Sequence, residues 1–452
     1  MPIAEHVLRH ATDRPRHVAV RGPAGDLTYA ELAAHISGAA RHLLGLGAGP
    51  GTLVGAGLAD PVALLTAVLA ADLAGATPLV GEHTWDRARW LGAAGPVDVL
   101  VDAPLPTVTG SPLRYEPRPD DRAWACFSSG STGRPRAVVR GRASWTASFP
   151  HLSDLAGIGP DDTVLIPGPL VSSLYAFAAM HTLATGATAL LPGRWPGSSL
   201  AALLGQATVV HLVPHRLPDV LGRPGPLRTA VVGGAALHPD ARAAAARAGV
   251  DVVSYYGATE LSFVAVDTDG RGLRPFPGVE IEVRDCDGPA GLGEVWARSP
   301  WLSDGYLGEA AGPLRRDSAG WMTVGDVAEP YRAGQALRVR GRGGGAIQTG
   351  GATVVPEDVE EVLRKVPGVG DIVVVGSPHP RLGAVVTAIV ESASPPPRSL
   401  LEAAARSGLD GVQRPRRWYA MPSLPRTGTG KPARALVAAR LADGAPDLRR
   451  LI

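Results

Sequence analysis

The chain of 452 residues is short of cysteine, of net charge and of long apolar runs. Its two cysteines, Cys126 and Cys286, match neither a disulfide framework nor a zinc-ligand spacing, so a reducing, cytoplasmic compartment is expected. The formal net charge of +2 argues against a dedicated nucleic-acid binder. Residues 1–10 lack the apolar run of a signal peptide. The most apolar stretch, residues 62–80, contains Asp72 and predicts a buried helix followed by a strand, not a membrane span.

Lysine is the scarcest charged residue. It occurs twice, at Lys365 and Lys431, so 42 of the 44 lysine and arginine residues are arginine. Such a ratio is typical of a G+C-rich, bacterial genome that replaces lysine by arginine wherever the chemistry allows. Lys365 follows a charged helical stretch, where a solvent-exposed side chain is expected. Lys431 lies in a Thr-Gly-Thr-Gly-Lys loop, and its retention there predicts a role that a planar guanidinium cannot take.

Hydrophobic residues make up 45% of the chain, which suffices for a large core divided among several domains or subdomains. Over the first 340 residues, apolar strand-like runs alternate with alanine-rich helical stretches. The strand-like runs are 53–57, 163–166, 208–213 and 229–232, and the helical stretches are 29–46, 62–71, 175–184 and 241–248. This alternation predicts parallel α/β layers. Two shorter runs, 279–284 and 293–297, predict a β-rich subdomain.

The sequence Arg-Gly-Arg-Gly-Gly-Gly at 340–345 predicts a hinge, because three consecutive glycines lower the cost of large changes in φ and ψ. The predicted organisation is an N-terminal domain at 1–341, a hinge at 342–345 and a C-terminal domain at 346–452. The C-terminal domain is expected to be a smaller α+β unit. Its predicted helices are 356–364, 400–405 and 433–441, and its predicted strands are 371–375 and 384–391.

A loop rich in small hydroxyl side chains follows the apolar run 123–127. It contains Ser128, Ser129, Gly130, Ser131, Thr132, Gly133 and Arg136. Glycines allow backbone N–H groups to approach an anion, hydroxyls add donors, and arginines add positive charge. The loop therefore predicts a phosphate-binding site, with a polar surface turn as the alternative. Its spacing differs from that of the common P-loop, which argues against a kinase or GTPase.

The same loop resembles the phosphate-binding signature of the adenylate-forming superfamily, S-G-[ST]-[ST]-G-x-P-K, with Arg136 in place of the lysine. That superfamily includes acyl-CoA synthetases, adenylation domains of peptide synthetases and luciferase-like enzymes. Arginine keeps the positive charge with a different geometry. Further signatures follow in the family's order up to residue 434. The resemblance implies a large N-terminal domain of layered α/β subdomains and a β-rich subdomain, with a small mobile α+β C-terminal domain.

Two segments before residue 261 resemble the family's adenine and phosphate motifs. They are the glycine turn of Gly233, Gly234 and Ala235, and the Tyr-Gly-x-Thr-Glu motif that starts at Tyr256 and includes Gly257. The resemblance implies that Tyr256 lies against adenine, that Thr259 contacts the α-phosphate of ATP, and that Glu260 helps to hold Mg²⁺. An aromatic plane, a hydroxyl donor and a hard oxygen ligand suit these tasks. Considered alone, the second motif is more typical of a strand end with a hydrogen-bonded glutamate.

Three further signatures are implied by the resemblance to complete the nucleotide and thiol sites. Asp326 would accept hydrogen bonds from the ribose hydroxyls, and Arg342 would reach the ribose region. Gly344 stands at the hinge position where the family usually has Asp or Lys, and Gln348 replaces a usual lysine. Gly351 keeps the glycine that lets the pantetheine arm of CoA pass close to the backbone.

The segment at 424–434 resembles the family motif P-x-T-x-x-G-K-x-x-R and implies that Lys431 is the catalytic lysine of adenylation. The lysine count singles out the same residue independently. The implied reaction has two steps. The acid carboxylate attacks the α-phosphate of ATP, with Mg²⁺ neutralising the developing charge. A swing about Gly344 then withdraws Lys431 and admits a thiol, which takes the acyl group and releases AMP.

The candidate acid pocket is formed by Ser172, Tyr175 and Tyr255. Ser172 stands where many members have a histidine, and Tyr175 replaces a frequent glycine. Tyr175 would narrow the pocket toward short or aryl acids, or else belongs to the core of the helix to residue 184. No aspartate is evident that would receive the ammonium of an amino acid, which favours a plain carboxylic acid.

The leading hypothesis is an acid–CoA ligase that uses ATP, Mg²⁺ and CoA on a small carboxylic acid. A second is a stand-alone adenylation enzyme that loads an amine or a carrier protein supplied in trans. A third, of another class, is a pseudo-enzyme that binds nucleotide or a partner without turnover. The departures at Arg136, Gly344 and Gln348 support the third hypothesis. The retained Glu260, Asp326 and Lys431 argue against it. Acid-dependent pyrophosphate exchange separates the pseudo-enzyme from the two enzyme hypotheses, and AMP release with CoA or with a carrier protein separates those two from each other.

Overall fold

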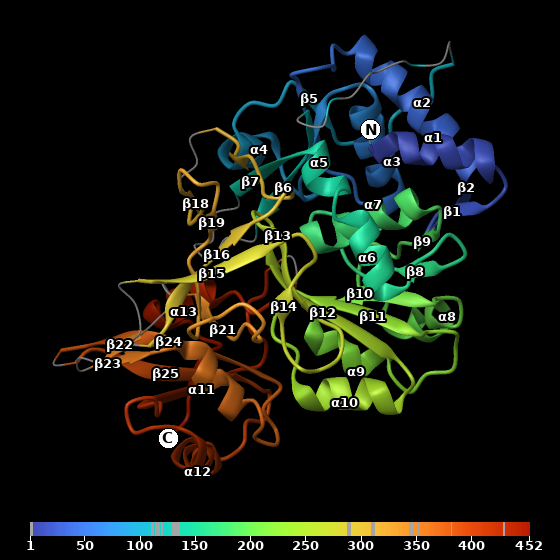
Figure 1. The fold of residues 1–452 in the computed structure, drawn as a ribbon. Helices are drawn as coiled ribbons and strands as arrows, with labels where there is room; N and C mark the ends of the chain where they lie inside the picture. Colours follow the sequence, from blue (N-terminus) through green and yellow to red (C-terminus); the bar gives the residue numbers. More distant parts are fainter. Residues whose placement is uncertain are drawn as a thin grey trace. The chain divides into compact units, whose positions relative to one another are not determined.

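The computed structural model describes the chain except residues 1–2, 110–112, 114–117, 119–120, 129–135, 287–290, 309–311, 343–344, 346, 350–351, 381 and 428–429. The chain divides into two compact units, coloured by sequence in Figure 1. Unit 1 comprises Met1–Ser128, Pro135–Glu280 and Arg298–Gly312. Unit 2 comprises Ser129–Arg134, Ile281–Ala297 and Pro313–Ile452.

Unit 1 contains a nine-stranded sheet with the order β14-β13-β12-β11-β10-β8-β9-β1-β2. The six strands from β12 to β1 run parallel to one another, and the strands beyond them at both edges are antiparallel. In that order, the strands are Arg274–Pro275, Ser262–Asp267, Asp251–Ala258, Thr229–Gly233, Val209–Leu212, Thr163–Leu165, Thr188–Leu190, Val18–Gly22 and Gly25–Thr28. Among the helices that connect them are α6 (Phe149–Ala156), α7 (Ser173–Thr185), α8 (Leu200–Leu204), α9 (Leu217–Val220) and α10 (Pro239–Arg247). The predicted parallel α/β layers are therefore confirmed.

A second sheet of unit 1 has the order β17-β7-β6-β4-β3-β5. Its strands are Gly305–Tyr306, Arg136–Gly141, Arg122–Ser128, Thr77–Val80, Leu53–Ala56 and Val99–Val101. Helices of this part of the chain are α1 (Ile3–Asp13), α2 (Tyr29–Gly45), α3 (Pro61–Leu73), α4 (Arg87–Ala94) and α5 (Arg142–Thr146). Helix α3 and strand β4 confirm the buried helix and strand predicted for 62–80.

Asp72 interrupts the apolar sequence of α3, yet its side chain is fully buried. It forms an ion pair with Arg142 of α5 and accepts a hydrogen bond of 2.9 Å from the Ala4 backbone N–H. A buried carboxylate is tolerated where a cation and a donor satisfy it. Among the described residues, none of the helices is both long and apolar enough to cross a membrane.

Unit 2 holds the β-rich region and an α+β region. The first sheet has the order β18-β19-β16-β20-β21, with β15 paired to β16. Its strands are Arg315–Arg316, Met322–Thr323, Gly293–Arg298, Asp326–Ala328, Val339–Arg342 and, for β15, Glu280–Asp285. The second sheet has the order β23-β22-β25-β26-β27, with β24 paired to β25. Its strands are Ala352–Val354, Ile347–Thr349, Gly383–Glu391, Arg417–Met421, Arg449–Arg450 and, for β24, Asp371–His379.

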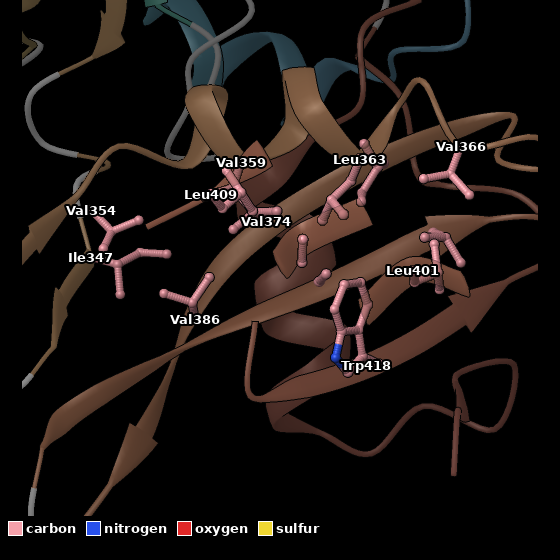
Figure 2. Close-up of a cluster of buried hydrophobic side chains, with 14 of the residues drawn as sticks. Ile347, Val354, Val359, Leu363, Val366, Val374, Val386, Leu401, Leu409 and Trp418 are labelled. Carbon is pink, nitrogen blue, oxygen red and sulfur yellow. The ribbon is translucent and has the colours of Figure 1, made fainter. Parts of the chain in front are cut away.

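The α+β region has its own hydrophobic core. Helices α11 (Pro356–Leu363) and α12 (Arg398–Gly408) pack on the sheet that contains β24 and β26, and α13 (Arg434–Ala442) also belongs to this region. Figure 2 shows Val359 and Leu363 of α11, Leu401 of α12 and Trp418 of β26 in this cluster. Each of these side chains is at most 1% exposed. The predicted mixed α/β fold with a C-terminal α+β domain is thus confirmed.

Candidate active site

The carboxyl ends of the parallel strands of unit 1 lie at one edge of the nine-stranded sheet. From β8 the chain passes to β9 on one side, and then to β10 on the other side of β8. In parallel α/β sheets, ligands bind outside the carboxyl ends of the strands at such a reversal. Of the predicted site residues, Ser172 and Tyr175 follow β8, Gly233 ends β11, and Tyr255 and Tyr256 lie near the end of β12. The fold therefore brings these five residues to one edge.

The end of β12 is tightly packed against β13. A Cβ atom on Gly257 would lie 2.1 Å from the Ser262 carbonyl oxygen, so glycine is required at this position. Ser262 itself has a φ of +58°, a left-handed backbone conformation. Beyond the strand, Thr259 Oγ1 lies 2.9 Å from Ser173 Oγ at the first turn of α7. The predicted phosphate-contacting hydroxyl is therefore held beside the helix that follows β8.

Glu260 is buried, at 5% exposure, one residue beyond Thr259. Its Oε1 accepts a hydrogen bond of 2.9 Å from the Tyr306 hydroxyl, and its carbonyl oxygen accepts one of 2.9 Å from the Ser303 backbone N–H. Tyr306 belongs to β17, which pairs with β7. Both the backbone and the side chain of Glu260 are thus fixed from the 303–306 segment.

Across the residues that the structure describes, His, Cys, Asp and Glu side chains form no group of three or more that could hold a metal ion. Mg²⁺ commonly takes one or two carboxylates together with substrate phosphates and water. Glu260 is a hard oxygen ligand of this kind, and Tyr306 bonds one of its two oxygens. The single carboxylate fits the role implied for it.

The glycine turn after β11 contains a residue in the left-handed backbone region. Gly234 has a φ of +91°, which favours glycine. Gly233 leaves room for the Tyr255 ring, since a Cβ atom there would lie 2.2 Å from the ring carbon Cζ. Ala235 is exposed and Tyr256 is half-buried. A side chain at either glycine would disturb the turn or displace the Tyr255 ring.

The three residues of the predicted acid pocket lie close together in the chain's fold. The Tyr175 ring occupies the space beside Gly168, where a Cβ atom would lie 2.0 Å from its Cε2. Burial raises the pKa of Tyr175 to about 12, and burial together with the neighbouring Tyr175 raises the pKa of Tyr255. Ser172 is 4% exposed, and its Oγ has no hydrogen-bond partner among the described residues. A buried hydroxyl without a partner favours a polar ligand atom.

Most of the predicted phosphate loop, Ser129 to Gly133, lies outside the described residues, as does the side chain of Ser128. The flanking strands are described. Ser128 ends β6, Arg136 begins β7, and the two residues are directly opposed in an antiparallel pair. The half-buried Arg136 is therefore placed by the second strand of a β-hairpin.

In unit 2, Asp326 begins β20 and is directly opposed to Arg342 of β21, whose side chain is outside the described residues. Burial raises the pKa of the nearby Glu357, and the charge of Asp326 adds to this effect. The predicted hinge residue Gly344 and the predicted CoA-channel residue Gly351 also lie outside the described residues, as does the side chain of Gln348. Lys431 is half-buried in the loop before α13.

Sequence reasoning missed two residues that hold this site. Ser173 bonds Thr259, and the predicted helix at 175–184 began two residues after it. Tyr306 was not singled out, because its bond to Glu260 joins residues 46 positions apart and has no local signal.

Comparison with known proteins defines the class to which this arrangement belongs. The AMP-binding enzyme model matches residues 94–307, and the AMP-binding enzyme C-terminal domain model matches residues 358–431. An uncharacterized acyl–CoA ligase of Bacillus subtilis, YhfT, is 31% identical over 74% of this chain and 70% of its own length. The chain therefore belongs to the AMP-binding enzymes of the adenylate-forming superfamily, as the motifs indicated.

Solved structures agree with this assignment. ATP-bound MatB from Rhodopseudomonas palustris has a TM-score of 0.86 at 22% identity, covering 97% of this chain and 99% of MatB. The amide bond synthetase McbA from Marinactinospora thermotolerans has a TM-score of 0.78 at 27% identity, covering 97% of this chain and all of McbA. Both share the fold of this chain.

Proposed function

We propose that this protein activates a small carboxylic acid with ATP and transfers the acyl group to the thiol of CoA. The observation that carries the proposal is the pair of contacts that fix Thr259 and Glu260 at the carboxyl edge of the sheet, Ser173 to Thr259 and Tyr306 to Glu260. Relatives described as acyl–CoA ligases support the thiol acceptor. A cytoplasmic location stays a prediction from the cysteine content.

In the first step, a carboxylate oxygen of the acid attacks the α-phosphorus of ATP, and the bond to pyrophosphate breaks. Positioning and charge neutralisation account for most of the rate of such a step. Thr259 would donate a hydrogen bond to the α-phosphate, and Lys431 would place its ammonium on the charge that develops there. Mg²⁺, held by Glu260, would supply further neutralisation on the phosphates.

In the second step, the CoA thiolate attacks the acyl carbon and AMP leaves as the acyl-phosphate bond breaks. Asp326 and Arg342 would retain the ribose through both steps, and Gly351 would lie beside the pantetheine arm. The acid would occupy the space bordered by Ser172, Tyr175 and Tyr255. The buried Tyr175 ring favours a short or aryl acid.

The test is acid-dependent exchange of radiolabelled pyrophosphate into ATP, measured on the full chain with a panel of short aliphatic and aryl acids. Exchange with at least one acid, followed by CoA-dependent release of AMP, is the expected result. Absence of exchange with every acid, while ATP still binds, would favour a pseudo-enzyme instead.

An amine acceptor is the second candidate. It is favoured by the similarity to the amide bond synthetase McbA, at 27% identity over nearly the whole chain. The acyl-adenylate would then react with an amine nitrogen to give an amide and AMP. Product analysis by mass spectrometry with CoA and with a panel of amines separates an amide from a thioester. A carrier protein supplied in trans is a third acceptor, and a phosphopantetheinylated carrier belongs in the same experiment.

A further inference from the structure

The loop that carries Lys431 is a short hairpin with a defined hydrogen-bond frame. Arg426 and Pro432 form an antiparallel bridge. The Thr427 N–H donates to the Lys431 carbonyl over 2.7 Å, and the Gly430 N–H donates to the Thr427 carbonyl over 2.8 Å. The Ala433 N–H closes the base by donating to Pro425 over 2.7 Å. These bonds between 425–427 and 430–433 therefore hold the backbone of Lys431 in place within the loop.

Arg426 anchors one side of this hairpin to two carboxylates. Asp371 of β24 and Glu391 of β25 are directly opposed in the sheet, and both side chains are largely buried. Like charges directly across a strand pair repel. The Arg426 guanidinium lies between them, 3.2 Å from Asp371 Oδ2 and in contact with Glu391 Oε2. The same guanidinium donates over 3.0 Å to the Gly430 carbonyl, next to Lys431.

Arg434 anchors the other side. It begins α13, three residues after Lys431. Its guanidinium donates to Glu360 Oε1 over 2.5 Å and to Glu357 Oε1 over 2.8 Å, both on α11, and to the Val374 carbonyl of β24 over 2.6 Å. Glu360 is 6% exposed, and a buried carboxylate requires such a partner.

The two anchors belong to one charge network. Arg364 lies 3.4 Å from Asp371 and 3.9 Å from Glu360, so it connects the acid that binds Arg426 with the acid that binds Arg434. Positive and negative groups alternate along this path, which runs over α11, β24 and β25. The hairpin is thus fixed at both ends to the same rigid elements of the α+β region.

We propose that Arg426 and Arg434 are positioning residues, which hold the hairpin so that the Lys431 ammonium is presented in one orientation for adenylation. This inference rests on the role proposed for Lys431. Arg426 is the better probe, because it contacts the hairpin directly at Gly430. Its loss would leave the opposed Asp371 and Glu391 without their shared cation and release the carbonyl next to Lys431.

The experiment compares Arg426→Gln with Arg440→Gln in the full chain. Arg440 lies on α13 in an exposed ion pair with Asp447 and makes no described contact with the hairpin, so it is the matched control. Arg426→Gln is expected to lower the kcat of pyrophosphate exchange about 100-fold, the scale of a displacement near 1 Å, with the KM values for ATP and acid little changed. Thioester formation from preformed acyl-adenylate should keep the wild-type rate.

A second variant separates positioning from stability. Combining Arg426→Gln with Glu391→Gln removes the repulsion between the opposed carboxylates, so thermal stability should recover while exchange stays low. Recovery of exchange in this double variant would overturn the inference, because the Gly430 contact would then be dispensable. An equal loss in both half-reactions of Arg426→Gln would overturn it as well.

Amide hydrogen exchange gives a readout that needs no turnover. The amides of Thr427, Gly430 and Ala433 should exchange faster in Arg426→Gln and at the wild-type rate in Arg440→Gln. If these amides respond as expected while the wild-type protein catalyses no pyrophosphate exchange, the anchoring stands and the proposed function fails. Unchanged amide protection in Arg426→Gln would overturn the anchoring itself.

Discussion

The Tyr306 hydroxyl donates a hydrogen bond to Glu260 Oε1 over 2.9 Å, and it thereby fixes the carboxylate that follows β12 from a strand of the other sheet of unit 1. Glu260 is buried, so this bond determines which of its oxygens remains for a ligand. The orientation of a proposed metal ligand thus depends on a residue far from it in sequence.

Replacing this tyrosine tests that dependence. Tyr306→Phe should raise the Mg²⁺ concentration needed for half-maximal pyrophosphate release about 10-fold, because a hydrogen bond to a charged group contributes about 1.5–3 kcal/mol. A Mg²⁺ titration at saturating ATP and acid measures this. Tyr419→Phe, on β26, is the control and should leave the Mg²⁺ requirement unchanged. An unaltered requirement in Tyr306→Phe would show that the bond does not orient a metal ligand.

The two lysines provide a paired comparison. Lys431→Ala should lower pyrophosphate exchange by at least about 100-fold, the cost of removing one preorganised charge-stabilising donor. Transfer of the acyl group from preformed acyl-adenylate should be nearly unaffected. Lys365→Ala removes an exposed side chain 3.7 Å from Glu361 and should change neither rate. Wild-type exchange in Lys431→Ala would refute its assignment.

Two glycine substitutions should have opposite effects on stability. Gly257→Ala places a Cβ atom 2.1 Å from the Ser262 carbonyl and should lower the free energy of unfolding by about 1–3 kcal/mol, with loss of exchange activity. A Cβ atom at Gly92, in helix α4, would meet no atom within 4 Å. Gly92→Ala should therefore raise the free energy of unfolding by about 0.4–1 kcal/mol. Urea unfolding of both variants measures the difference. Equal effects would mean that the packing at Gly257 is not limiting.

Two buried histidines predict sensitivity to acid. Burial lowers the pKa of His181 to about 4, and burial together with His181 lowers the pKa of His211 to about 3. In the unfolded chain each histidine binds a proton with a pKa near 6.5. The free energy of unfolding therefore keeps the full contribution of these histidines above that pH, and it falls as the pH drops toward 4. At pH 5.5 each histidine should lower the free energy of unfolding by about 1.4 kcal/mol relative to neutral pH.

The variant His211→Leu tests this sign. Its free energy of unfolding should fall less than that of the wild type between pH 7.5 and pH 5.5, whatever its absolute stability. Urea unfolding at the two pH values gives the change in the free energy of unfolding for the variant and for the wild type. If the free energy of unfolding of His211→Leu falls between pH 7.5 and pH 5.5 by as much as that of the wild type, His211 does not contribute to the acid sensitivity.

Much of the fold could be predicted because periodic apolar runs and glycine or proline boundaries are local signals. Strand β11 and helix α11, for instance, end within one residue of their predicted bounds. Helix α1 was not predicted, since Glu5, His6 and Arg9 interrupt its apolar residues and only Ile3, Ala4 and Val7 are buried.

The motifs could be placed from sequence, but their supporting contacts could not. Asp72 broke an apolar run, and the partner that explains it, Arg142, lies 70 residues away. Likewise, Arg426 gave no hint of Asp371 or Glu391, because the opposition of those acids depends on the register of β24 and β25. Register and long-range ion pairs are properties of the folded chain, not of any local window.

The shared direction of the strands from β12 to β1 has a consequence for how this protein can change. Because Ser172 and Tyr175 follow β8 instead of lying within it, the loops after β8 and β10 can be redesigned without altering any buried strand register. Selectivity for a new acid could therefore be sought by exchanging those two connections as cassettes, while the framework around Thr259 and Glu260 is left intact.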